Sequence, residues 1–102
     1  MAYRNSSGRN GYIYILSNVK RSVLYIGVTS ELDKRIFEHK HGKGSKFTAK
    51  YNLKVLLYFE LYPNINEAIE REKQLKNWHR QWKFNLIKKS NPQLKNLSDQ
   101  IL

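Results

Sequence analysis

The chain of 102 residues has no cysteine, only two prolines and five glycines, and few acidic residues. Without cysteine it can form neither a disulfide framework nor a zinc site with thiolate ligands. No apolar run approaches the length of a membrane-spanning helix, and no segment predicts a long basic amphipathic helix for a membrane surface. We therefore expect a cytoplasmic protein without a membrane partner.

Positive charge is what the chain has in excess. Nineteen Lys and Arg oppose eight Asp and Glu, which gives a formal net charge of +11. A small basic domain typically binds a polyanion, and nucleic acid is the first candidate. Two simpler explanations stay open here: charge that only keeps the protein soluble, and charge that binds an anionic membrane surface.

The length of the chain favours a single domain with one small core. A hydrophobic fraction of 40% is sufficient for such a core, so a disordered chain is not expected. Residues 1–10 are polar and show no periodicity, and they are predicted to form a flexible N-terminal arm. We place the domain at residues 11–92 and interpret residues 93–102 as a C-terminal tail packed on it.

Three unbroken runs of β-branched, aromatic and aliphatic residues predict strands that are buried on both faces. They cover residues 12–16, 23–28 and 55–59. A short polar turn joins the first two, which predicts an antiparallel hairpin.

Helical patterns fill the segments between and after these strands. Ser30 with Asp33 resembles a capping box and predicts a helix to about residue 40. A short helical turn is expected at residues 46–51. Asn64 with Glu67 forms a second cap-like pair and predicts a helix to about residue 75.

After a break near Asn77 a further helix is expected to run to about Lys89 and to end before Asn91-Pro92. The order β-β-α-β-α-α predicts an α+β fold, with a small three-stranded antiparallel sheet flanked by helices. Trp78 and Trp82 share one helical stripe, so we interpret them as core residues rather than as residues that stack on a nucleobase.

The predicted hairpin carries two short motifs. Tyr12-Ile13-Tyr14 is on its first strand and Tyr25-Ile26-Gly27 is on its second, with ten residues between them. Arg35 and His39 follow in the next helix, and Glu72 lies in the helix after the third strand. This ordered set resembles the signature of the GIY-YIG nucleases. The chain looks most similar to small stand-alone bacterial members, which resemble the GIY-YIG nuclease domain of the bacterial excinuclease. It departs from the signature where its first residue, Tyr12, replaces a glycine.

The hairpin itself predicts where the two tyrosines lie. Residues that pair across a hairpin share a face, and side chains alternate along each strand. If Ser17 pairs with Ser22, Tyr14 is opposite Tyr25 and both phenols project from one face. The residues alone leave a simpler interpretation open, in which both are core tyrosines whose hydroxyls reach the rim.

Arg35 and His39 are four residues apart, so they lie side by side on their helix. They either belong to a solvated basic face or lie near the sheet, where the planar guanidinium of Arg35 suits phosphate oxygens. Gly27 either ends the second strand or lets the backbone approach a phosphate closely.

Glu72 falls on the apolar side of its predicted helix, in the same arc as Ala68 and Leu75. A carboxylate on such a face needs an ion pair, a proton or a metal ion. Lys76, one turn later, is one candidate partner. The other interpretation is a metal site that faces the two tyrosines.

The resemblance implies an endonuclease that hydrolyses phosphodiester bonds in DNA, in repair or in the processing of structured DNA. It implies a single Mg²⁺ or Mn²⁺ held by Glu72, with Tyr14 as the base or as the group that orients the attacking water. The catalytic set that it implies is Tyr14, Tyr25, Gly27, Arg35, His39 and Glu72, and Asn85 is a further candidate.

Nucleic-acid contacts are predicted mainly on the loop after the first helix, where lysines alternate with Phe47 and Tyr51. A solvated lysine loop with two anchoring aromatic residues explains this pattern equally well. The predicted contacts are Lys43, Lys46, Lys50, Lys76 and Arg80. The alternative function is a nucleic-acid-binding module of the same fold without catalysis, and a structural or ribosome-associated basic protein comes third.

Overall fold

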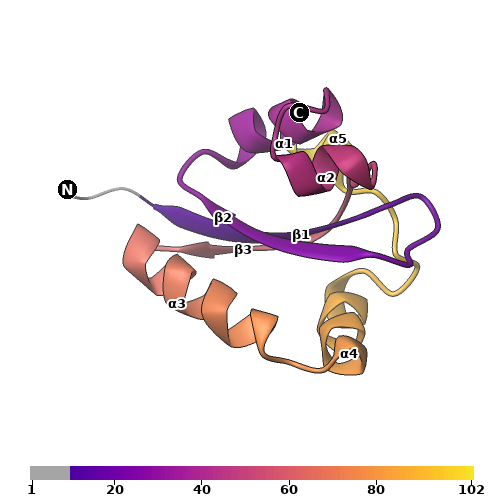
Figure 1. The fold of residues 1–102 in the computed structure, drawn as a ribbon. Coiled ribbons are helices and arrows are strands. Elements are labelled where there is room, and N and C mark those ends of the chain that lie inside the picture. Colours follow the sequence, from indigo (N-terminus) through magenta and orange to yellow (C-terminus); the bar gives the residue numbers. More distant parts are fainter. Residues whose placement is uncertain (1–9) are drawn as a thin grey trace.

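The computed structural model describes residues 10–102, so nearly all of the predicted N-terminal arm lies outside the described residues. Figure 1 shows an antiparallel sheet between two layers of helices. The strands are β1 (Gly11–Ser17), β2 (Leu24–Thr29) and β3 (Val55–Tyr62), in the spatial order β2-β1-β3. The predicted α+β class and the three-stranded sheet are confirmed.

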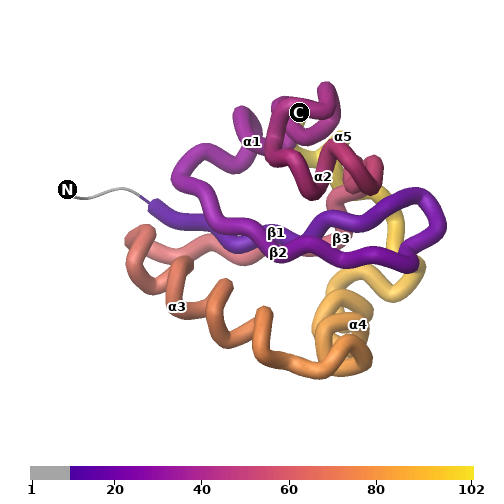
Figure 2. The backbone as a smooth tube through the Cα atoms, in the orientation of Figure 1, coloured from indigo at the N-terminus to yellow at the C-terminus, as the bar shows by residue number. Residues whose placement is uncertain are grey.

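The helices divide between the two faces of the sheet. One layer holds α1 (Leu32–Lys40), α2 (Lys46–Lys50) and α5 (Ser98–Ile101), and the other holds α3 (Ile65–Lys76) and α4 (Arg80–Ser90). The tube in Figure 2 shows the C-terminal segment, in yellow, crossing from α4 on one face to α5 on the other. None of the helices in residues 10–102 is both long and apolar enough to cross a membrane.

The core has two halves because successive side chains of β1 point to opposite faces. Ile13 and Ile15 are fully buried in the half that α3 covers. Tyr14 and Leu16, each 1% exposed, belong to the half that α1 covers. This two-sided burial is the reason why β1 is an unbroken apolar run and shows no alternation of polar and apolar residues.

The hairpin register differs from the predicted one by two residues. Ser17 pairs with Leu24 and not with Ser22, and Tyr14 pairs with Gly27. A shift of two residues leaves every side chain on its predicted face, because the side-chain period of a strand is two.

The side chain of Asn18 accounts for the shift. Its oxygen accepts hydrogen bonds from the backbone N–H groups of Ser22, at 2.8 Å, and of Val23, at 3.1 Å. These two residues therefore belong to the turn, which is longer than predicted, and the ladder of β1 and β2 begins beyond them.

The two predicted helix starts have different outcomes. Asn64 caps α3, because its side-chain oxygen accepts a hydrogen bond from Glu67 N at 3.0 Å. The expectation that Ser30 opens a helix with Asp33 is wrong. The N-cap of α1 is Glu31, without a side-chain capping bond, and the carboxylate of Asp33 instead accepts a bond from the N–H of its neighbour at 2.8 Å.

The C-terminal segment covers the outer edge of β3. The β1–β3 pairing is irregular between Ile15 and Leu16, so that Leu57 has no partner in the register. Asn91 donates a hydrogen bond to the carbonyl of Leu57 at 3.0 Å. The backbone N–H of the neighbouring Leu56 donates a hydrogen bond to Asn96 Oδ1 at 3.1 Å, and its carbonyl accepts one from Leu97 N at 2.7 Å. An exposed strand edge is a template for aggregation, and these bonds occupy it.

A polar network ties α3 to β3. Glu60 of β3 accepts hydrogen bonds from the hydroxyls of Tyr58 and Tyr62, and two more from Arg71 of α3, at 2.9 and 3.0 Å. Burial raises the pKa of the Glu60 carboxyl, but the bonds from Arg71 and the two tyrosines outweigh burial and hold this pKa below its usual value.

We expect Glu60→Gln to lower the free energy of unfolding by about 1–3 kcal/mol at neutral pH, because two hydroxyls and a guanidinium lose a charged acceptor. A carboxyl whose folded pKa is depressed stabilises the protein above its unfolded pKa, near 4.5, and this contribution disappears as pH falls through the folded pKa. The difference between the two proteins should therefore shrink in acid. Urea unfolding over a pH series measures it, with the exposed Glu70→Gln as the matched control. A difference that stays constant into acid would contradict the network.

Candidate active site

Tyr14 lies at the centre of the site, on the middle strand of the sheet, opposite Gly27 of β2. A Cβ atom on Gly27 would lie 2.3 Å from both Cζ and the hydroxyl oxygen of Tyr14. The ring therefore covers the backbone of Gly27 and requires a residue without a side chain there. Gly27 lies inside β2 and does not end it, and the group that approaches its backbone is the Tyr14 ring. Close approach of this backbone to a phosphate stays a prediction.

A buried histidine binds the Tyr14 hydroxyl. His39 of α1 is 2% exposed, and its Nε2 lies 2.9 Å from the hydroxyl oxygen. Its Nδ1 lies 3.0 Å from Thr48 Oγ1, whose own hydroxyl donates to the carbonyl of Ser45 at 3.2 Å. Since the proton of Thr48 is used in that bond, we assign the ring proton to Nδ1, and Nε2 accepts from Tyr14.

In the segment from Gly44 to Thr48, the sequence predicts Lys46 as a nucleic-acid contact, but it does not identify Gly44, Ser45 and Thr48 as the residues that surround His39. A Cβ on Gly44 would lie 1.9 Å from His39 Nδ1, so the loop packs directly on the imidazole. Ser45 caps α2 by accepting a hydrogen bond from Thr48 N at 3.1 Å. The short helical turn predicted at residues 46–51 is confirmed as α2, and Ser45, an N-cap residue type directly before it, is the signal that marks its start.

Burial keeps the Tyr14–His39 pair neutral. It raises the pKa of the Tyr14 phenol to about 12, although hydrogen bonding with the Arg35 guanidinium acts in the opposite direction. Burial, assisted by the positive charge of Arg35, lowers the pKa of His39 to about 4. Near neutral pH the phenol therefore keeps its proton and the imidazole carries no charge.

Arg35 connects the buried pair with the solvent. Hydrogen bonding with the Tyr14 phenol is the main cause that raises the pKa of its guanidinium, and its Nη1 lies 3.1 Å from Glu38 Oε1. Its side chain is 34% exposed. With Val28 and Thr29 of β2 it lines a pocket of about 310 Å³, whose other lining residues are Glu31, Lys34 and Glu38. A phosphate in this pocket would meet the guanidinium at the edge of the sheet.

An aromatic cluster extends from the site to the surface. The Tyr25 ring lies on the same face as Tyr14, with centroids 6.3 Å apart, and 5.9 Å from the ring of His39. The exposed ring of Phe47 stacks on that of Tyr25, with centroids 6.1 Å apart, and the ring of Tyr51 lies 4.8 Å from that of Phe47. Tyr25 is partly exposed, so it is the phenol of the pair that solvent reaches.

The predicted nucleic-acid contacts lie in two different layers. Lys43, Lys46 and Lys50 are exposed on or before α2, beside the aromatic cluster, and the ammonium of Lys50 lies 5.3 Å from the centroid of the Tyr51 ring. Lys76 and Arg80 lie in the other layer, on α3 and α4.

Glu72 is not brought onto the face of the tyrosines. It belongs to α3, which packs against the opposite face of the sheet, and its carboxylate forms an ion pair with Lys76 at 3.0 Å. The side chain of Glu72 is 15% exposed, as the apolar arc predicted, whereas Lys76 is 54% exposed. The expected location facing the tyrosines is thus wrong, because the helix that carries Glu72 covers the face of Ile13 and not that of Tyr14.

Asn85 and the tryptophans also lie apart from the tyrosines. Asn85 is exposed on α4 and accepts a hydrogen bond from Gln81 at 3.0 Å. Trp78 is partly buried and packs against the core, whereas Trp82 is 53% exposed. The interpretation of Trp82 as a core residue is therefore wrong. Trp78 lies in the break between α3 and α4, and Trp82 lies in the first turn of α4, so they are not on one continuous stripe.

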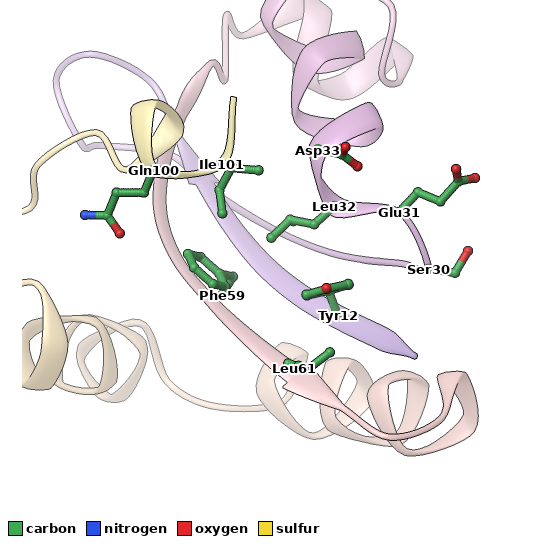
Figure 3. A pocket seen from close by; sticks show the side chains of 9 residues that line it. All are labelled: Tyr12, Ser30, Glu31, Leu32, Asp33, Phe59, Leu61, Gln100 and Ile101. Carbon is green, nitrogen blue, oxygen red and sulfur yellow. The ribbon is translucent and has the colours of Figure 1, made fainter. Parts of the chain in front are cut away.

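A larger pocket, of about 560 Å³, lies elsewhere on the α1 side of the sheet. Figure 3 shows Tyr12 and Phe59 from the strands and Ile101 from α5 around it, with Glu31 and Asp33 at the start of α1. Among the described residues, no Lys or Arg lines this pocket to offset the two carboxylates. In the Arg35 pocket, by contrast, Lys34 and Arg35 offset the carboxylates of Glu31 and Glu38, so the Arg35 pocket suits a phosphate better.

Comparison with known proteins agrees with this geometry. The GIY-YIG catalytic domain matches residues 10–85 of the chain. The UPF0213 protein of Clostridium perfringens is 42% identical over 76 residues, which are 74% of this chain and 81% of that protein. The UPF0213 protein of Staphylococcus saprophyticus is 38% identical over 76 residues, 74% of this chain and 92% of that protein.

A solved structure agrees as well. The solution NMR structure of a UPF0213 protein from Bacillus halodurans has a TM-score of 0.55 and 32% identity, and the match covers 85% of this chain and 92% of that one. The chain belongs to the GIY-YIG catalytic domain family. Within it, the chain is similar to the small bacterial proteins named UPF0213. Membership of this nuclease family points to nucleic acid as the general class of substrate and to divalent metal chemistry.

We expect Gly27→Ala to destabilise the protein by about 1–3 kcal/mol, because the new methyl group overlaps the Tyr14 ring. The same substitution in a Tyr14→Ala background should cost much less, since the ring that it overlaps is gone. Chemical denaturation of the four proteins measures this coupling. Additive effects of the two substitutions would show that the ring does not depend on Gly27.

Proposed function

We propose that this chain is a metal-dependent endonuclease that hydrolyses phosphodiester bonds in DNA, with a role in the repair or processing of structured DNA. The position of Arg35 carries the proposal. Its guanidinium bonds to Tyr14 on the inside, and on the outside it lines a pocket beside the edge strand β2. In a GIY-YIG chain with a net charge of +11, an anionic phosphodiester is the group that fits there.

Arg35 is proposed to bind the scissile phosphate. A guanidinium presents two parallel donors to phosphate oxygens and stabilises the charge that grows on them in the transition state. Glu38 holds Nη1 in the free protein and is itself 33% exposed, so a phosphate can take its place without leaving a buried carboxylate unpaired. Tyr14 and His39 act as positioning residues that fix the other side of the guanidinium.

The burial of Tyr14 changes the role proposed for it. A phenol that is 1% exposed, with a pKa of about 12, does not suit direct contact with the attacking water. Tyr25 lies beside it on the same face and reaches solvent. We therefore assign the orientation of the attacking water to Tyr25, and to Tyr14 the positioning of Arg35.

Glu72 remains the proposed ligand of the divalent metal. In residues 10–102 no group of three or more His, Asp or Glu side chains is placed to hold an ion. Mg²⁺ does not require such a cage, because it binds through one or two carboxylates together with waters and substrate phosphates. The exposed Lys76 can move away from the sheltered Glu72 carboxylate, and α3 packs against β2 as well as β1. When bound, Mg²⁺ or Mn²⁺ supplies Lewis-acid chemistry.

One observation favours the alternative function, a nucleic-acid-binding module without catalysis. The Glu72 carboxylate is already neutralised by Lys76, in the layer opposite the tyrosines. In a module that only binds, this ion pair would be purely structural, and the loss of the carboxylate would change stability without changing metal binding.

We expect Arg35→Ala to reduce the single-turnover rate of DNA cleavage by a factor on the order of 10²–10³, because a transition-state contact is lost. The affinity for DNA should change little, since many other cations remain. Gel-based cleavage of flap, branched, nicked and linear DNA measures the rate. Lys40→Ala, an exposed substitution at the end of the same helix, is the control and should cleave like the parent protein. A normal rate for Arg35→Ala would reduce Arg35 to a surface charge.

The second test concerns Glu72→Gln. This variant should fold and bind DNA, but it should lose Mg²⁺-dependent cleavage because the amide is a poor ligand for Mg²⁺. Binding of Mn²⁺ to the protein–DNA complex, followed by paramagnetic broadening of NMR signals, gives a readout that is independent of turnover. The exposed Glu70→Gln, two residues away on α3, serves as control. Unchanged cleavage and unchanged Mn²⁺ binding in Glu72→Gln would favour the purely structural ion pair.

A further inference from the structure

A tryptophan lies open to solvent at the start of α4. Trp82 is 53% exposed, and the rings of Trp78 and His79 meet it edge-on, with centroids 6.0 and 5.0 Å away. A pocket of about 310 Å³ opens beside Trp78 and Trp82, and Leu86 and Lys89 complete one wall. An exposed aromatic ring next to an apolar hollow is typical of a ligand-binding surface.

The sequence around this pocket is mostly basic, although Lys76 and Arg71 are paired with Glu72 and Glu60. The sequence contains no Asp or Glu from residue 73 to residue 98. The same stretch contains seven basic residues, Lys73, Lys76, Arg80, Lys83, Lys88, Lys89 and Lys95. Arg71 adds a guanidinium 5.2 Å from the centroid of the Trp78 ring. The partner of this surface must therefore combine an apolar group with negative charge.

Single-stranded nucleic acid has both properties in a suitable arrangement. An apolar peptide would fill the pocket but would leave the cations without a partner. Intact duplex DNA would neutralise the cations but keeps its bases stacked inside the helix. A single-stranded segment presents an unpaired base with a phosphate on either side, and bases stack on aromatic side chains. Asn85 lines the pocket, and its oxygen accepts a hydrogen bond from Gln81 at 3.0 Å, which leaves its amide NH₂ to bond to the edge of a base.

We propose that the pocket beside Trp78 and Trp82 binds an unpaired nucleobase of a single-stranded segment of the substrate. This inference rests on the proposed function only in taking nucleic acid as the substrate class. It assigns a second contact surface, because α3 and α4 lie on the sheet face opposite the tyrosines. Arg80 at the start of α4 donates a hydrogen bond to the carbonyl of Ser22 in the β1–β2 turn at 2.6 Å, which fixes this surface to the hairpin that carries the site.

A substrate that contacts both layers must pass around the sheet. A DNA with a junction between duplex and single strand is suited to this path, since its flexible strand can bend where its duplex cannot. The proposal therefore narrows the substrate class to nucleic acids with an unpaired segment near the cleaved bond.

The two tryptophans make the pocket directly observable. They are the only tryptophans in the chain, so intrinsic tryptophan fluorescence reports on this surface alone. We expect a single-stranded oligonucleotide to quench this fluorescence in the absence of metal, and a blunt duplex of equal length to quench it much less at equal saturation. Saturation is followed independently by the anisotropy of a labelled oligonucleotide. Equal quenching by both DNAs, or quenching by neither, would overturn the proposal.

Substitutions separate stacking from charge. Trp82→Ala should weaken the binding of the single strand about tenfold, equivalent to about 1.4 kcal/mol, and that of the duplex by less than about twofold. Trp82→Phe should retain most of the affinity. Phe37→Ala removes an aromatic ring of α1 that is 54% exposed and serves as the matched control. Equal weakening for both DNAs, or none for either, would contradict a base-binding pocket. Because binding is measured without metal, a failure here leaves the cleavage tests with Arg35→Ala and Glu72→Gln unaffected.

Discussion

The contact between the Tyr14 ring and the backbone of Gly27 is the constraint on which the site depends. Because the ring covers its cross-strand neighbour, the Tyr14 hydroxyl reaches across the hairpin to His39 instead of into solvent. The imidazole of His39 in turn packs on the backbone of Gly44 and forms a hydrogen bond with the hydroxyl of Thr48. These two contacts fix the positions of the loop before α2 and of α2 itself. A tyrosine and a glycine at paired positions thus determine where two helical segments pack.

The electrostatics of the site follow from the same burial. Tyr14 and His39 are both neutral near pH 7, because a charge on either would lie in the apolar half-core without water. The charge of the site is therefore concentrated on Arg35, whose side chain is 34% exposed. A rigid neutral interior behind one oriented cation suits recognition of an anion, since the guanidinium need not reorganise when the phosphate arrives.

The sequence predicted the elements well because their signals are local. Apolar runs identify three strands, and Asn64 with Glu67 marks the start of α3. The hairpin register failed because the side chain of Asn18 replaces a backbone partner, and hydrophobic pattern does not encode such bonds. The shared face of Tyr14 and Tyr25 is nevertheless as predicted, since face depends only on whether the shift is even or odd.

The candidate site was harder to predict, because it depends on which face each helix covers. The arc of α3 correctly predicts that Glu72 is sheltered, but periodicity does not say whether the helix packs above or below the sheet. The same limit applies to Trp82, whose spacing from Trp78 indicates a common stripe only if the helix is continuous. The break between α3 and α4 turns Trp82 outward.

The two edges of the sheet explain why chemistry belongs beside β2. The edge of β3 is occupied near its start, because the C-terminal segment bonds to both backbone groups of Leu56 and to the carbonyl of Leu57. The edge strand β2 instead contributes Val28 and Thr29 to the pocket of Arg35. Both helical layers meet at this strand, since its Tyr25 packs with the α1 side and its Val28 with the α3 side. The proposed phosphodiester at the β2 edge would lie between the layer that carries Arg35 and the layer that carries Glu72. The separation of Arg35 and Glu72 by the sheet is thus compatible with a shared substrate, provided that the substrate binds across this edge and not on either face.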